Sequence, residues 1–366
     1  MSLDLTDVVP LVRERAAETE AARGPSAEVL AALRAAGCLR LLTPRERGGL
    51  ELPLPDVLEV VRALAEGDGA VGWLVGQAAV AQLVLSRFPA EAAEACFPDG
   101  PDTVGAGAAA PKGKALPVEG GWRVSGQWPF VSGIDHARWV FLQCAVFGGE
   151  AVELRAMLVP VADVERLDTW RSLGLRGTGS HDVRVRGFCP QARSADLLTA
   201  GATPDRPAYR VPTVPYGATV VAAAALGIAA AAVAELVACS DRRPAFSRDR
   251  LADTPEHLAG VGLLTTRLRA ADALLAADAR TAHHAAETGR SFSGDLGRLR
   301  SAAAWCAHEA RAVVDAAHRL AGGPAVYDGT PLQRHLRDVY TATQHAAVNP
   351  QAHTALGTEI LRGAQP

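Results

Sequence analysis

The spacing of hydrophobic residues changes twice along the chain. Up to about residue 110, apolar residues recur every three or four positions, which predicts helices. From there to about residue 205 they alternate with polar residues, most clearly on either side of Gly120-Gly121, as in a β-hairpin. Helical spacing returns near residue 213. We therefore expect an α+β protein with an N-terminal α-helical domain (1–110), a central β-domain (111–205) and a C-terminal four-helix bundle (206–366).

Some predicted helices carry recognisable ends. Ser26 can cap a helix that runs to Ala36, because Gly37 suits the left-handed position that closes a helix. Two further helices are expected at 55–66 and 72–88. The C-terminal bundle is expected to contain helices at 213–240, 255–288, 295–321 and 330–348, the last of which could extend to Arg362.

The composition excludes several classes of protein. Among the 366 residues, 37 are basic and 40 acidic, a balance that argues against a nucleic-acid partner. The six cysteines are widely separated and form no Cys-x-x-Cys pair, a pattern typical of reduced thiols in a cytoplasmic protein. The N-terminal residues lack the order of charged and apolar residues found in a signal peptide.

One uncharged segment, Gly217 to Ala234, is long enough to cross a membrane. It consists mostly of alanine, whereas efficient insertion requires leucine, isoleucine, valine or phenylalanine. We therefore expect a helix buried in a bundle or subunit interface, with no membrane association. Small side chains favour close helix packing, so a homo-oligomer is also expected, with a tetramer as the preferred state.

Four segments carry a family resemblance. They read LRAAGCLRLLTPRERGG (33–49), GGWRVSGQWPFVSGIDHARWV (120–140), WRSLGLRGTGSHDVRV (170–185) and AGGPAVYDGTPLQRHLRDVYTATQH (321–345). In this order they resemble the acyl-CoA dehydrogenase superfamily of flavoproteins. The resemblance implies that superfamily's fold, which has N-terminal helices, a central β-domain and a C-terminal four-helix bundle.

Two departures point to one branch of this superfamily. No Glu-Gly-Thr follows Arg337-Asp338 where a dehydrogenase often has its carboxylate base, and Gly357-Thr358-Glu359 comes later and in another order. The segment 319–323 reads RLAGG instead of Gln-x-x-Gly-Gly. Both features are similar to the oxygenase components of two-component (group D) flavin-dependent monooxygenases. That branch implies a hydroxylase that uses reduced FMN or FAD and O2 on a small, aromatic or polyketide-like substrate.

The same resemblance implies a separate NAD(P)H-dependent flavin reductase as partner. Consistent with this, no Gly-x-Gly-x-x-Gly follows a predicted strand, so a nicotinamide-binding domain is not indicated. Two other functions stay open from the sequence. One is an FAD-dependent acyl-CoA dehydrogenase or desaturase, and the other is a non-catalytic scaffold with a flavoprotein fold.

The resemblance also assigns residues to a flavin site. Ser132 and Ser180 are expected to face the isoalloxazine ring near N5, although serine beside glycine by itself indicates only a turn. The backbone N–H groups of Thr178 and Gly179 are expected to contact the flavin.

Aromatic residues complete the expected flavin site. Phe130 and Trp170 would cover the ring and exclude water. A strand tryptophan is more commonly a core residue, so the place of Trp128 stays open.

His345 is the expected general base, because histidine titrates near neutral pH and could remove the proton of a phenol. The resemblance also places one arginine of a cluster at the flavin phosphate of a neighbouring subunit. That cluster contains Arg242, Arg243, Arg248 and Arg250, and the sequence does not choose among them.

Two other motifs are expected to bind neither a metal ion nor a phosphate. His283 and His284 point about 100° apart on a helix, so no metal site is expected there. The glycine-rich segment 105–107 is expected to be a loop at the edge of the flavin.

Overall fold

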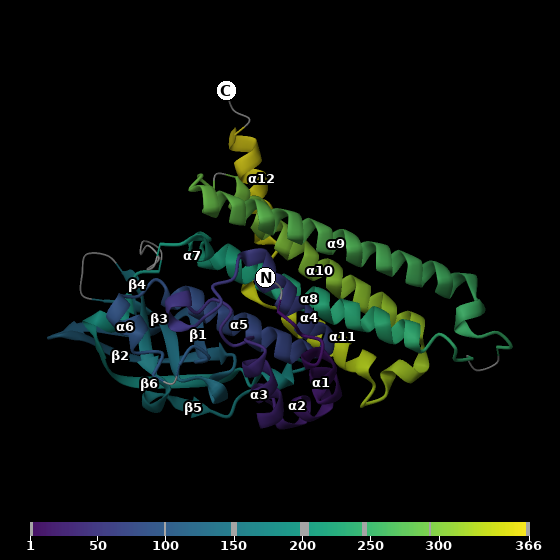
Figure 1. The fold of residues 1–366 in the computed structure, drawn as a ribbon, viewed down its shortest axis with the longest axis horizontal. Coiled ribbons are helices and arrows are strands. Elements are labelled where there is room, and N and C mark those ends of the chain that lie inside the picture. Colours follow the sequence, from purple (N-terminus) through teal and green to yellow (C-terminus); the bar gives the residue numbers. More distant parts are fainter. Residues whose placement is uncertain are drawn as a thin grey trace.

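The computed structural model describes residues 3–98, 100–147, 152–197, 205–243, 247–292 and 294–363. Helices come first in the sequence, followed by a β-sheet and then by a second group of longer helices, in the mixed α+β arrangement that was expected. The sheet lies at one end of the molecule and the long helices extend to the other end, with the first helices between (Figure 1).

The N-terminal helices follow the predicted periodicity closely. Ser26 accepts a hydrogen bond from the Val29 amide and Gly37 has a φ of 80°, which confirms both predicted helix ends. The elements are α1 (Val8–Glu14), α2 (Ala16–Ala22), α3 (Ala27–Ala35), α4 (Leu54–Gly67), α5 (Gly69–Leu85) and α6 (Ala90–Glu94). The apolar faces of α1, α3, α4 and α5 join the main core of the molecule, whereas α6 packs in a smaller cluster against the sheet.

A seven-stranded sheet with the order β5-β6-β2-β1-β3-β4-β7 follows. The predicted hairpin is present, because Val118 pairs with Gly121 across its turn. The register of β2 against β6 shifts between Trp128 and Val131, so β2 carries a bulge there. The strands are β1 (Gly105–Val118), β2 (Gly121–Val131), β3 (Trp139–Val146), β4 (Glu153–Pro160), β5 (Glu165–Leu167), β6 (His181–Pro190) and β7 (Ser194–Ala195).

The expectation of a loop at 105–107 is wrong. These residues begin β1 and pair with β3, where Gly105 lies opposite Trp139. A Cβ atom at Gly105 would lie 2.2 Å from the Trp139 ring, so this strand contains glycine because a neighbouring aromatic ring covers its backbone. Periodicity alone does not report this kind of contact.

The second group of helices contains three of the four predicted helices with nearly the expected bounds. The fourth prediction is wrong, because helix α11 ends at Ala342 and a separate helix begins at Gln351. Pro350 directly precedes the second helix, and since proline disfavours helical backbone in the residue before it, one helix could not continue through Asn349. The elements are α7 (Pro207–Arg210), α8 (Thr213–Ala238), α9 (Pro255–Thr288), α10 (Asp295–Ala321), α11 (Pro331–Ala342) and α12 (Gln351–Gly363).

The alanine-rich helix α8 is the centre of the core. It packs against α10, α4, α5 and α11, and most of its side chains are buried. It is also the one helix of the described residues that is long and apolar enough to pass as a membrane span. Its burial by neighbouring helices explains its composition, because small side chains allow helix backbones to approach closely.

Candidate active site

Four polar side chains and one carbonyl form a continuous series of hydrogen bonds, here called the hydroxyl relay. The Trp73 indole Nε1–H donates to Ser132 Oγ over 3.1 Å, and Ser132 Oγ lies 2.8 Å from Ser180 Oγ. Ser180 Oγ is 2.7 Å from Thr178 Oγ1, which donates to the Leu175 carbonyl over 2.7 Å. The structure thus brings together Ser132, Ser180 and Thr178, the three hydroxyl-bearing residues that the sequence assigned to the flavin.

The relay joins two loops at the ends of strands. Ser132 follows β2, whereas Thr178 and Ser180 lie in the short connection before β6. The Gly133 amide donates to the Thr178 carbonyl over 3.0 Å, which fixes the two loops to each other. Gly179, between Thr178 and Ser180, has a φ of 50°, a left-handed conformation that glycine adopts easily.

Helix α11 holds the second loop from below. Asp338 accepts a hydrogen bond from the Leu175 amide over 2.6 Å, and the Thr341 hydroxyl accepts one from the Gly174 amide over 2.9 Å. Gly174 is needed for this contact, because a Cβ there would lie 2.1 Å from the Arg337 carbonyl oxygen. Leu175 itself has a φ of 49°, a strained value for a branched side chain.

Two buried carboxyl groups lie behind this contact. Asp338 and Asp68 are almost fully buried, and Asp68 caps helix α5 through the Ala70 amide. Burial raises the pKa of Asp68, and the nearby Asp338 raises it further. Burial likewise raises the pKa of Asp338. The loop that carries Leu175 of the relay is therefore held by Asp338, one of two neighbouring carboxyl groups whose charged forms are disfavoured by burial.

An aromatic pair stands beside the relay. Phe130 and Trp170 meet edge to face, with ring centroids 6.3 Å apart. Phe130 lies in the bulge of β2 with a φ of 64°, and 69% of its surface is exposed. An aromatic residue held in strained backbone and left open to solvent is typical of a binding surface. Trp128, by contrast, is fully buried and donates to the Gln143 carbonyl, so it is a core residue.

His181 fixes Trp170 through the backbone. Its Nδ1 accepts hydrogen bonds from the amides of Thr169 and Trp170, each over 3.2 Å. The side chain is fully buried, and burial followed by the charge of Arg166 lowers its pKa. The Arg166 guanidinium, which can only donate, lies 3.0 Å from Nε2, so donors face both ring nitrogens. His181 therefore acts as a fixed acceptor that positions the aromatic pair.

His345 is a further neighbour of Trp73, besides Ser132 of the relay. Its ring meets the Trp73 indole edge on, with centroids 5.5 Å apart. It belongs to the turn after α11 and not to the helix on which it was expected. The ring is exposed to solvent, yet the protein around it removes enough water to lower the pKa of His345. Its Nδ1 accepts from the Ala347 amide over 3.2 Å, so a neutral ring carries its hydrogen on Nε2.

Sequence reasoning missed Trp73 and His181. Trp73 lies in an apolar helix whose pattern indicates only burial, so nothing local marks its indole as a hydrogen-bond donor to Ser132. His181 directly follows Ser180 in the GTGSH segment, and this adjacency was the available signal. Gln77, on the same helix as Trp73, is half-buried.

The arginine cluster lies far from the relay. Arg242 donates to the carbonyl of Ala321, directly before Gly322-Gly323, whereas Arg250 pairs with Asp253 over 2.9 Å and with Asp241 over 3.1 Å. The connection between α8 and α9 that carries these arginines is at the opposite end of the molecule from the sheet (Figure 1).

Within the described part of the chain, no group of three histidine, cysteine, aspartate or glutamate residues is arranged to hold a metal ion. His283 faces Glu287, with 3.5 Å between His283 Nε2 and Glu287 Oε1.

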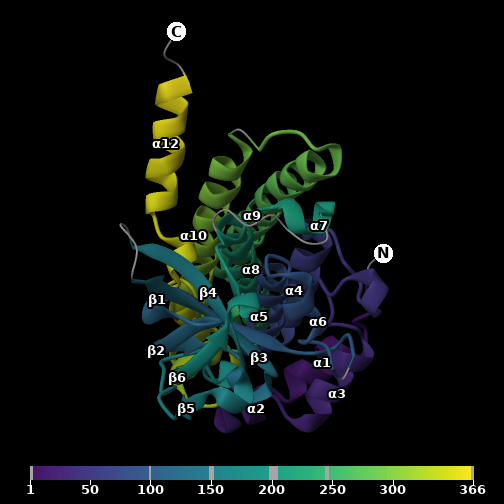
Figure 2. The same ribbon diagram turned by 90° about the vertical axis from the view of Figure 1, so that its left-hand side faces the viewer.

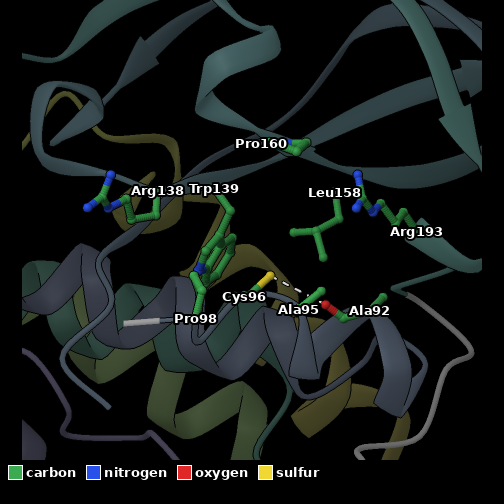
Figure 3. A pocket seen from close by; sticks show the side chains of 9 residues that line it. All are labelled: Ala92, Ala95, Cys96, Pro98, Arg138, Trp139, Leu158, Pro160 and Arg193. Carbon is green, nitrogen blue, oxygen red and sulfur yellow. Dashed lines mark hydrogen bonds between the residues drawn. The ribbon is translucent and has the colours of Figure 1, made fainter. Parts of the chain in front are cut away.

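A cavity of about 210 Å³ lies elsewhere, between α6 and the strands β3 and β4 (Figure 3). Trp139 and Leu158 from the sheet face Cys96, and Arg138 and Arg193 lie at its edges (Figure 3). It is near the C-terminal end of α5, whereas Trp73 is near the start of that helix. This cavity is therefore separate from the relay.

The residues at the relay suit a flavin. An exposed Phe130 and a half-buried Trp170 offer apolar surface for a planar ring. The half-buried Ser132 offers a polar atom beside it, and Ser180, which is 3% exposed, lies directly behind Ser132 in the relay. The backbone strain at Phe130 and Leu175 marks the same place from both loops. These features fit a ring that is apolar on its faces and polar along its edge.

Comparisons with known proteins agree with this site. A family model described as acyl-CoA dehydrogenase, C-terminal domain, matches residues 219–350. The chain is 30% identical to the indole-3-acetate monooxygenase of Pseudomonas putida, over 97% of this chain and 91% of that protein. It is 30% identical to the flavin-dependent monooxygenase, oxygenase subunit HsaA, of Mycobacterium tuberculosis, over 95% of this chain and 91% of that protein. The chain belongs to the oxygenase components of two-component flavin-dependent monooxygenases.

The fold of this oxygenase agrees with a solved structure, that of XiaF from Streptomyces sp. in complex with FADH2 and glycerol. The TM-score is 0.93 at 28% identity, covering 99% of this chain and 94% of XiaF. The protein is thus a flavin-dependent monooxygenase with an acyl-CoA dehydrogenase fold, which requires a separate flavin reductase and a small-molecule substrate. Family membership decides against the dehydrogenase and scaffold alternatives.

Proposed function

We propose that this oxygenase hydroxylates a small aromatic substrate that carries a ring hydroxyl group, using reduced FMN or FAD from an NAD(P)H-dependent reductase. The observation that carries the proposal is the position of Trp73, whose indole contacts the relay through Ser132 and His345 through its ring edge. A flavin at the relay and a substrate at His345 would then be neighbours. The relative named for indole-3-acetate supports an aromatic substrate.

The protein's own part in the reaction is to position groups and exclude water. When bound, the reduced flavin would supply two electrons to activate O2, so that one oxygen atom enters the substrate and the other leaves as water. Phe130 and Trp170 would cover the ring, and Ser132 and Ser180 would hydrogen-bond to its edge. The backbone amides of Thr178 and Gly179 donate to the carbonyls of Leu175 and Arg176. These two hydrogen bonds make the turn rigid where it would support the flavin.

We assign His345 the role of hydrogen-bond donor to the substrate oxygen. The bond from the Ala347 amide occupies Nδ1, so the free nitrogen of the neutral ring is Nε2 and carries the hydrogen. In this tautomer the ring stabilises a phenolate oxygen, whereas the expected general-base role would require Nε2 without its hydrogen. The lowered pKa keeps the ring neutral at pH 7.

One substitution separates the two roles of His345. Glutamine places an N–H group close to the position of Nε2 but cannot take up a proton, so His345→Gln retains most hydroxylation if the residue is a donor. His345→Ala removes the donor and lowers hydroxylation by about 100-fold in either role. A Gln variant as inactive as the Ala variant would restore the general-base assignment. Flavin binding, measured separately, shows whether either variant has lost the cofactor instead.

We propose that the active form is a homotetramer. We also propose a cytoplasmic location, which the widely separated cysteines favour. Helix α12 extends away from the rest of the molecule, and Leu361 on it is 73% exposed (Figures 1 and 2). Tyr327, close to Gly322-Gly323, is 70% exposed as well. Apolar surface of this kind favours burial against another copy of the chain. Light scattering at micromolar concentration should give a tetramer, and a monomer would contradict the proposal.

The proposed function is tested by coupled turnover. The protein, a generic NADH-dependent flavin reductase, FMN or FAD, and O2 are mixed with a panel of phenols and polyketide-like aromatics. Substrate-dependent formation of a product with one additional oxygen atom is the expected result. Reactions without the oxygenase, and with catalase added, exclude oxidation by free peroxide. Oxygen consumption that yields only hydrogen peroxide with every aromatic compound would overturn the assignment of substrate class.

A further inference from the structure

Only one placement of hydrogens puts a hydrogen in every contact of the hydroxyl relay. The Leu175 carbonyl can only accept, so the Thr178 hydroxyl donates its single hydrogen to it. At its 2.7 Å contact with Ser180, Thr178 Oγ1 must then accept. The Ser180 hydrogen is therefore directed to Thr178.

The same reasoning continues to the other end of the relay. Because Ser180 has no second hydrogen, it must accept at its 2.8 Å contact with Ser132, and Ser132 donates. The Trp73 indole can only donate, and it donates to Ser132. Every contact then has one hydrogen, and all the bonds point from Trp73 towards Leu175.

This direction decides what the relay offers to a ligand. Ser132 and Ser180 have each donated their only hydrogen within the relay, and each retains one free lone pair. In the described ranges, their side chains have no hydrogen-bond partners other than the relay members. A polar group that approaches Ser132 or Ser180 must therefore be a donor.

We propose that the direction of the relay, set by Thr178 and the Leu175 carbonyl, makes the site select reduced over oxidised flavin. This inference rests on the proposed function, in which the flavin edge lies at Ser132 and Ser180. Reduced flavin has an N5–H group that can donate to a serine lone pair. Oxidised flavin has only a lone pair at N5, which would face another lone pair, an arrangement that disfavours binding.

Thr178 is thus a positioning residue that determines specificity through Ser180. The selection suits an enzyme that takes up reduced flavin from a reductase and must release oxidised flavin after each turnover. The change of flavin N5 from donor to acceptor on oxidation would favour both the uptake of reduced flavin and the release of oxidised flavin, without any movement of the protein.

Thr178→Val tests the proposal directly. Valine has nearly the shape of threonine and lacks the hydroxyl, so the Ser180 hydrogen becomes free to donate to oxidised flavin. The Leu175 carbonyl still accepts from Trp170 Nε1 over 3.1 Å and from the Thr178 amide over 3.0 Å, so it is not left without a donor. Oxidised FMN should bind about tenfold more tightly than to wild type.

The preference for reduced FMN, measured as the ratio of the two dissociation constants, should fall by the same factor of about ten. This change lowers the two-electron potential of the bound flavin by about 30 mV. Thr178→Ser keeps the hydroxyl and should retain the wild-type ratio. A loss of packing alone would weaken binding of both flavins and could not strengthen one of them.

The measurements are titrations with oxidised FMN in air and with dithionite-reduced FMN under anaerobic conditions, repeated with FAD. Circular dichroism confirms folding, and Thr178→Ala replaces the valine variant if that protein does not fold. Unchanged dissociation constants in a folded Thr178 variant would overturn the role of the relay. If the wild-type protein still prefers reduced flavin in the same titrations, the proposed function remains intact. A wild-type protein that binds neither form of either flavin would overturn both.

Discussion

The relay and the arginine-bearing end of the long helices differ in how complete they are within one chain. At the relay, Trp73, Ser132, Ser180 and Thr178 satisfy one another, and Asp338 holds the loop from behind. At the other end, Arg242 lies beside glycines and Tyr327 is exposed. One region has its polar groups paired with one another before any ligand arrives, and the other exposes an aromatic ring near an arginine that donates to a backbone carbonyl.

This difference indicates how a cofactor site could be divided between copies of the chain. The ring-binding part is built from strands and loops of one protomer, which fixes hydrogen-bond direction. The proposed phosphate-binding part lies at the far end of the molecule and would reach the flavin of a neighbouring copy (Figure 1). The hydrogen bonds to the flavin ring are therefore expected to depend on the relay, and the affinity for the flavin is expected to depend on assembly of the oligomer.

The largest expected effect comes from breaking the relay. Ser180→Ala removes a hydroxyl beside the proposed flavin edge, and a positioned hydrogen bond at a reacting centre contributes on the order of 3 kcal/mol. Product formation should fall by about 100-fold while hydrogen peroxide release rises. Ser172→Ala is the control, because Ser172 belongs to the same loop but its hydroxyl donates to the Gly174 carbonyl and to no relay member among the described residues. Equal product yield in the two variants would contradict the role of Ser180.

The stability of α11, the helix that holds the relay loop through Asp338, can be tested at His335. Burial, followed by the charges of Arg334 and Arg13, lowers the pKa of His335 to about 3. The unfolded chain takes up this proton below about pH 6.5, so the stability due to neutral His335 is complete above that pH. It is lost as the pH falls towards 3, by about 1.4 kcal/mol per pH unit.

His335→Phe should therefore lose less stability than wild type between pH 6.5 and 4.5, by roughly 2 to 3 kcal/mol. Asp68 and Asp338 act in the opposite direction because their pKa values are raised, so the comparison must be between variant and wild type. Urea unfolding at several pH values measures the difference. Parallel pH curves for the two proteins would show that His335 is not the group responsible.

A smaller effect is expected where His181 positions the aromatic pair. His181→Asn places an oxygen close to the position of Nδ1 and should preserve acceptance from Thr169 and Trp170, whereas His181→Gln should not. The glutamine variant should bind reduced FMN about 30-fold more weakly, the equivalent of roughly 2 kcal/mol. The asparagine variant should bind nearly as well as wild type, and tryptophan fluorescence reports the state of Trp170. Identical behaviour of both variants would mean that His181 only fills space.

The smallest effect is expected at the incomplete end. Arg242→Ala should weaken binding of reduced FMN or FAD by about tenfold, because a guanidinium–phosphate contact is lost. Arg250→Ala is the matched control, since Arg250 already pairs with Asp253 and Asp241. The difference should disappear at protein concentrations where the oligomer dissociates. A difference that persists in monomers would place Arg242 at the flavin of its own chain and remove the contrast between the two regions.

Much of the fold followed from the sequence because its signals are local. Helical spacing, the cap at Ser26 and the hairpin at Gly120-Gly121 depend on residues a few positions apart. The motifs placed Ser132 and Ser180 near a flavin by resemblance. Local signals failed where a distant residue decided the outcome, as at Gly105, which pairs with β3 and is a glycine because the Trp139 ring covers it.

The sequence by itself determined the order of helices and strands, the family, and the hydroxyl groups available to a cofactor. Only the tertiary structure decided how those groups are connected, because Trp73 meets Ser132 across 59 positions and Asp338 meets Leu175 across 163. It also placed His345 in a turn against Trp73 and separated Arg242 from the relay. A hydrogen bond acquires its direction only when donor and acceptor are packed together, and packing depends on the whole chain.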